Sequence, residues 1–96
     1  MRSVGYGDLR AAARVLQAAP LVARQDLAAQ LVREAHWADK FGQRLSKPHP
    51  EWGGGTLSGA AARFERSADT WISDATYRHC ISLVLQALDC RDAFVG

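Results

Sequence analysis

The chain has 96 residues, of which 48% are hydrophobic, and a formal net charge of +2. This length suits one domain, spanning residues 1–96, with a modest core. The small net charge excludes the strong basicity typical of dedicated nucleic-acid binders. Much of the apolar content is alanine, which packs closely but buries little area per residue. A core this thin favours association with a further copy or a partner.

The first predicted element is an amphipathic helix that ends near Ala19. Its apolar residues follow the i, i+3, i+4, i+7 pattern of one helix face. They are Leu9, Ala12, Ala13 and Leu16. Asp8 is a suitable cap or first-turn acid, and Pro20 disfavours helical geometry at the residue before it.

A second, longer helix is predicted from Leu21 to about Leu45, and it carries two apolar stripes. The first stripe comprises Leu27, Leu31, Ala35 and Ala38, and the second comprises Trp37, Phe41 and Leu45. Two stripes on one helix indicate two contact surfaces. One is expected to face the first helix, and the other to face the rest of the domain or a second copy. The short link at Pro20 predicts an antiparallel hairpin.

A proline and glycine loop follows, from Ser46 to Gly55, with Trp52 at its centre. A large aromatic in such a loop marks either packing or a partner, and the sequence leaves both open. The glycine run before Thr56 suits either a tight turn or an anion site, and a lone glycine motif favours the turn. Thr56 is the expected cap of a short helix running through Leu57, Ala60, Ala61 and Phe64.

The last helix is predicted to begin after Ser73 or Asp74 and to end around Asp89 to Asp92. Its apolar residues match the helical pattern at almost every position. They are Tyr77, Cys80, Ile81, Val84, Leu85 and Leu88. Trp71 and Ile72 are expected to anchor the chain in the core just before it. The predicted fold is therefore all-α, a four-helix domain with an N-terminal antiparallel helical hairpin, a Pro/Gly loop and two further helices.

No constellation for catalysis or metal binding emerges. His36, His49 and His79 lack metal-ligand spacing, and no nucleophile sits in a recognisable signature. Cys80 and Cys90 lie too far apart on a helix for a disulfide, so both are read as free, buried thiols in a reducing compartment. We therefore expect no enzyme activity, no cofactor and no metal. With no secretory signal and no span of roughly 20 apolar residues, a cytoplasmic protein without membrane contact is expected.

Arg10, Arg14 and Arg24 are the candidate nucleic-acid contacts. The first two are four residues apart on one helix face, and the third can join them. Together they predict weak, sequence-independent contact with phosphates, although a solvated helix face is the commoner outcome of such a pattern.

Several motifs resemble those of small alphaproteobacterial proteins of similar length. The most specific is Pro48-His49-Pro50-x-Trp52-Gly53-x-Gly55-Thr56-Leu57, followed by Ala60-Ala61. Asp8-Leu9-Arg10-x-Ala12-Ala13-Arg14 and Asp74-x-x-Tyr77 are similar too. These proteins resemble the reduced small terminase subunit that is encoded beside the large terminase in gene-transfer-agent clusters. A departure from small terminases is that no separate N-terminal DNA-reading domain is visible.

The resemblance implies a non-catalytic DNA-packaging adaptor. Such a protein self-associates through its helical hairpin, engages the large terminase subunit and touches DNA weakly. The predicted self-association or partner residues are Leu27, Leu31, Trp37, Phe41 and Trp52. The alternative hypothesis is a small regulatory or adaptor protein that binds one other protein through Trp52 and the glycine-rich loop.

Overall fold

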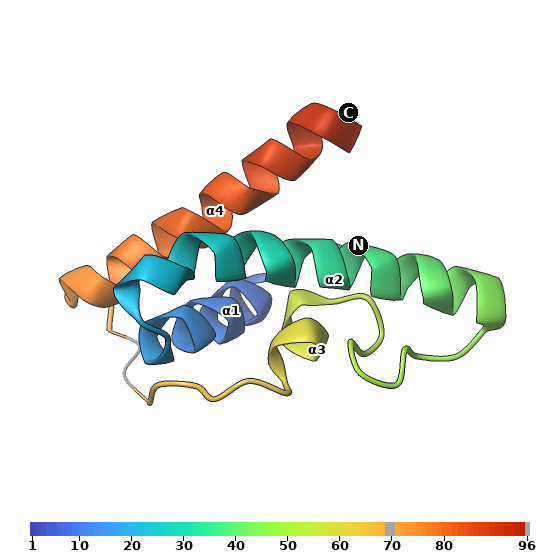
Figure 1. Cartoon of the computed structure of the whole chain (residues 1–96), viewed down its shortest axis with the longest axis horizontal. Coiled ribbons are helices and arrows are strands. Elements are labelled where there is room, and N and C mark those ends of the chain that lie inside the picture. The colour runs from blue at the N-terminus through green and yellow to red at the C-terminus, as the bar shows by residue number, and fades with distance from the viewer. Residues whose placement is uncertain (69–70, 96) are drawn as a thin grey trace.

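The structure, a computed structural model, describes residues 1–68 and 71–95, with side chains through Arg91. It contains α1 (Tyr6–Ala18), a short 3-10 helix η1 (Leu21–Ala23), α2 (Arg24–Leu45), α3 (Leu57–Ala61) and α4 (Ala75–Val95) (Figure 1). Over these residues the only β-type pairing is an isolated bridge between His49 and Gly53. The predicted all-α fold of four helices is confirmed.

Side chains add hydrogen bonds to the backbone at both ends of α1. At the start, the Asp8 carboxylate accepts hydrogen bonds from the Gly5 N–H at 3.0 Å and from the Ser58 N–H at 3.1 Å. The second bond joins α1 to the beginning of α3. At the end, the Arg24 Nε donates to the carbonyls of Leu16 and Ala19, and the Leu16 carbonyl also accepts from the Ala19 N–H.

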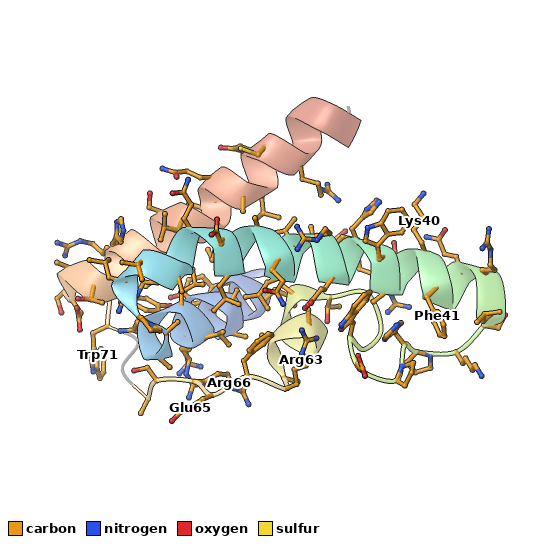
Figure 2. The ribbon with its side chains drawn as sticks, in the orientation of Figure 1. Lys40, Phe41, Arg63, Glu65, Arg66 and Trp71 are labelled. Atoms are coloured by element: carbon orange, nitrogen blue, oxygen red, sulfur yellow. The ribbon has the colours of Figure 1, made fainter. Side chains whose placement is uncertain are left out.

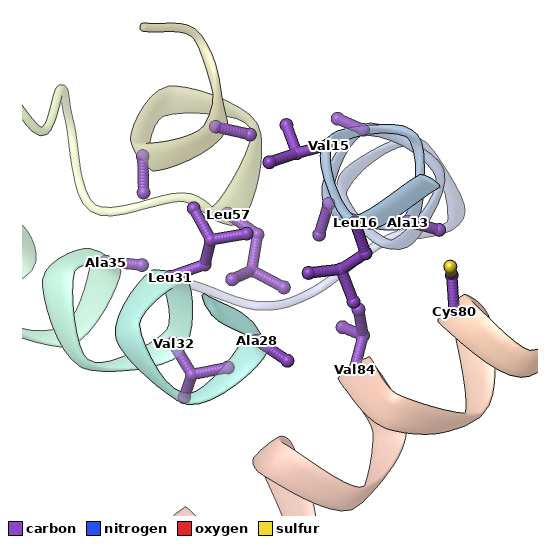
Figure 3. Close-up of a cluster of buried hydrophobic side chains, with 14 of the residues drawn as sticks. Ala13, Val15, Leu16, Ala28, Leu31, Val32, Ala35, Leu57, Cys80 and Val84 are labelled. Atoms are coloured by element: carbon purple, nitrogen blue, oxygen red, sulfur yellow. The ribbon is translucent and has the colours of Figure 1, made fainter. Parts of the chain in front are cut away.

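Pro20 turns the chain, and α2 runs back in the direction opposite to α1 (Figure 1). The predicted hairpin is present, but α1 also contacts α3 and α4. Leu31 of α2 and Leu57 of α3 lie beside Val15 and Leu16 of α1, and Val84 of α4 faces Leu16 (Figure 3). The core is therefore shared by all four helices.

Alanine allows these helices to approach closely. Six buried alanines lie at helix contacts where a larger side chain would hold the backbones apart. They are Ala12, Ala13, Ala28, Ala35, Ala60 and Ala61. The one charged side chain buried among the described residues is Glu34, and the Arg63 guanidinium contacts both of its carboxylate oxygens, at 2.7 and 2.8 Å. This ion pair ties the end of α3 to the middle of α2.

The segment before α4 differs from the expectation. Trp71 is 73% exposed and Ile72 is 54% exposed, so the prediction that they anchor the chain in the core is wrong. Tyr77, which is fully buried, fills the core at the start of α4 instead. Asp74 caps that helix through a 2.8 Å bond from the Thr76 N–H, as predicted.

Two further expectations about α4 need correction. The helix continues to Val95 rather than ending around Asp89 to Asp92. Cys80 is buried and Cys90 is exposed, both as free thiols. The exposure of Cys90 follows from the path of α4, whose C-terminal half stands apart from the other helices (Figure 1).

Candidate partner-binding surface

The loop after α2 is a compact turn built around His49. The His49 and Gly53 backbones exchange two hydrogen bonds, at 2.9 and 3.1 Å. Within the turn, the His49 Nδ1 accepts from the N–H groups of Glu51 at 3.1 Å and Trp52 at 3.0 Å. Gly53 has a φ of 78°, a left-handed conformation that favours glycine. The loop therefore has a defined shape.

This turn holds Trp52 in one orientation. The Trp52 ring stacks on His49 with centroids 4.4 Å apart and an interplanar angle of 7°. Phe41 of α2 meets the His49 ring edge-on at 4.8 Å, and Figure 2 shows Phe41 pointing from α2 toward the loop. The sequence left open whether Trp52 packs within the protein or faces a partner. In the structure its neighbours pack against it, yet it remains partly exposed.

These rings border an open hollow of about 790 Å³ between the end of α2 and the loop. We define the aromatic surface as its ring and apolar side chains, which are Trp37, Phe41, Leu45, His49 and Trp52. Trp37 is 54% exposed, although tryptophan is usually well buried. The charged residues that line the hollow are Lys40 and Arg44, and no carboxylate lines it.

The structure separates the two stripes that the sequence placed on α2. Leu31 is 1% exposed and Leu27 lies at the edge of the core, so the chain itself covers the first stripe. This corrects the expectation that Leu27 and Leu31 are available to a second molecule. Trp37 and Phe41 of the second stripe lie together with Trp52 at the aromatic surface. Sequence reasoning missed His49, whose position between two prolines was the available signal.

The predicted nucleic-acid residues interact with the chain itself. The Arg14 Nε donates to the Ser67 carbonyl at 2.6 Å, and Arg24 caps α1. Arg10 and Arg14 also affect the buried Tyr77 hydroxyl. Its pKa is raised by burial and then by Tyr6, and the charges of the two arginines oppose this rise. Arg14 and Arg24 therefore have acceptors within the chain, and their contact with phosphates stays a prediction.

Two further titratable groups, His36 and Asp39, are influenced by the N-terminal amine. Among the described residues, no group of three or more His, Cys, Asp or Glu side chains is placed to hold a metal ion. Burial lowers the pKa of His36, with the N-terminal amine, Lys40 and Arg91 lowering it further. The same amine forms a 3.1 Å ion pair with Asp39 and lowers the pKa of that carboxyl.

Across the described part of the chain, no helix combines the length and apolar character of a bilayer span.

The fold and this surface define a small all-α domain with an open aromatic hollow at one end. The chain belongs to the family described as a domain of unknown function, DUF7742, whose model matches residues 2–88. No curated protein and no solved structure matches the chain. The family match covers most of the chain and carries no mention of a terminase or of DNA packaging.

Proposed function

We propose that this protein is a non-catalytic adaptor that binds another protein through the aromatic surface. The observation that carries this proposal is the grouping of two tryptophans and a phenylalanine around an open hollow. Binding hot spots are enriched in tryptophan and arginine and lie in pockets that become desolvated. Trp37, Trp52 and Arg44 supply these residue types at one place.

The rigidity of the loop supports the same function. Trp52 is fixed by its stack on His49 and by its backbone bond to the His49 ring. A side chain ordered before binding loses less conformational freedom when a partner arrives. The cations at the hollow, Lys40 and Arg44, favour a partner that presents acidic groups beside its apolar anchor.

The resemblance to small terminases supplies a finer form of this proposal, in which the partner is a large terminase subunit and the function is DNA packaging. A protein partner is favoured over DNA as the direct contact, because Arg14 and Arg24 donate to backbone carbonyls. Any DNA contact is expected to be weak and to fall steeply with salt.

The exposed tryptophans provide a matched test. Trp37 lies at the aromatic surface, while Trp71 is exposed on the segment before α4. We expect Trp37→Ala to weaken binding of a purified large terminase at least about ten-fold, since hot-spot truncations cost 2 kcal/mol or more. Trp71→Ala is expected to leave the affinity unchanged, and circular dichroism checks that both variants stay helical.

A second arm keeps the adaptor proposal testable if the large terminase does not bind. A photo-crosslinking amino acid placed at position 37 or at position 71 is irradiated in the host cell. Specific cross-linking of one protein from position 37 alone supports an adaptor with another partner. Equal products from both positions, or none from position 37, overturn the proposal.

A further inference from the structure

A second open feature lies between α2 and α4. The C-terminal end of α4 points away from α2 (Figure 1). The space between them is a groove of about 480 Å³, which we call the α2–α4 groove. Its walls are one face of each helix: Gln25, Ala29, Val32, Arg33 and His36 from α2, and Leu83, Gln86, Ala87, Cys90 and Arg91 from α4.

The α4 helix carries apolar residues on more faces than the chain covers. Tyr77, Cys80 and Val84 face the core. Leu83 and Ala87 line the groove, and Leu85 is 47% exposed on a further face. Leu83 and Ala87 are partly buried against the core, and exposed apolar side chains beside a groove are typical of a contact surface. This part of α4 therefore presents apolar surface that the chain covers only in part.

Charge indicates what that neighbour is. The charged residues that line the α2–α4 groove are Arg33 and Arg91, and no carboxylate lines it. A complementary occupant is a helix with apolar residues and a nearby acid. The α4 helix meets this description, because it carries the exposed Leu85 and, four residues later, the exposed Asp89.

We propose that the α2–α4 groove is occupied by α4 of a second copy of this chain. In a two-fold dimer the same surface serves both copies, so each α4 lies in the groove of the other. One contact then fills the groove, covers the protruding apolar residues and places Asp89 of one copy near Arg33 of its partner. This dimer goes beyond the adaptor function, and it leaves the aromatic surface accessible on each copy.

Charge reversal tests the dimer with variants that leave the core intact. Arg33 and Asp89 are both exposed in the single chain. We expect light scattering and sedimentation to show a dimer for the wild-type chain. Arg33→Glu and Asp89→Arg are each expected to weaken dimerisation at least about ten-fold, and the double variant to recover part of the loss. The control, Arg66→Glu at an exposed position after α3, is expected to dimerise as the wild type does.

The two cysteines give an independent readout. Cys90 is exposed and lines the groove, while Cys80 is buried. Alkylation of Cys90 is expected to slow as protein concentration rises through the dimer dissociation constant, and Arg33→Glu is expected to abolish this protection. A chain that stays monomeric at high concentration overturns the proposal. So does a dimer that Arg33→Glu leaves unchanged, or a double variant no tighter than the single ones.

Discussion

At the scale of single residues, Gly55 is the most constrained position of the loop. Its φ is 98°, and a Cβ added there would lie 2.7 Å from the Asp39 Cβ and 2.8 Å from the Asp39 Cα. Both the backbone conformation and the contact with α2 therefore require glycine. Because Gly55 has no side chain, the backbone of the loop lies directly against Asp39 of α2.

We predict that Gly55→Ala lowers the free energy of unfolding by about 2–4 kcal/mol, through backbone strain and the clash with α2. Gly54→Ala is the matched control, because a Cβ there meets nothing within 4 Å. Urea unfolding followed by circular dichroism measures both variants. Equal stability of the two would contradict the account of the loop.

At the scale of helices, Arg24 shows how one side chain can fix a junction. It lies at the start of α2, and it donates to carbonyls of Leu16, Gln17 and Ala19 at the end of α1. A cation near a helix C-terminus also interacts favourably with the helix dipole. The angle between α1 and α2 therefore depends on a residue that the sequence alone placed in a DNA-binding group.

We predict that Arg24→Gln destabilises the protein by about 1–3 kcal/mol, because the carbonyls at the end of α1 lose a charged donor. Lys40→Gln is the control, since Lys40 is exposed on the same helix. Thermal unfolding compares them. If Arg24→Gln instead removed DNA binding with no loss of stability, the role of Arg24 as a cap would be wrong.

At the scale of the whole molecule, the free energy of unfolding is expected to fall as the pH falls. His36 has a pKa below its usual 6.5 because of burial and neighbouring cations. Asp8 and Asp39 both have a pKa below the usual 3.8. For Asp8, burial acts to raise the pKa, but the N–H groups of Gly5 and Ser58 outweigh it. A group with a lower pKa in the folded chain binds protons better when unfolded, so acid favours unfolding.

We therefore predict two stages of destabilisation. The first begins as the pH falls below about 6.5, when unfolded His36 takes up a proton that the folded chain resists, and the second begins below about 4 with the carboxylates. His36→Gln is expected to remove the first stage, while His79→Gln at an exposed position retains it. Unfolding free energies measured between about pH 2 and 8 test both stages. A first stage that survives in His36→Gln assigns it to another group.

The candidate site could be predicted only in part. Trp37 and Phe41 were recognised as one stripe and Trp52 as an unusual loop residue, because helical spacing and loop composition are local properties. Their meeting at one hollow depends on the His49 turn, and no local pattern fixes where a loop folds back. Hydrophobicity alone predicts that Trp71 is a core residue, whereas the buried aromatic side chain near the start of α4 is Tyr77.

The sequence by itself predicted the four helices approximately, the hairpin, the Thr56 cap and a cap at Ser73 or Asp74, because apolar periodicity and capping act over a few residues. It did not predict the 3-10 helix at Leu21–Ala23 or the continuation of α4 to Val95. Only the tertiary structure decided which apolar faces stay uncovered. Leu31 is enclosed by α1 and α3, whereas Leu85 and Trp37 remain exposed. The reason is that burial depends on contacts between segments far apart in the chain, and the direction in which α4 leaves the core sets those contacts.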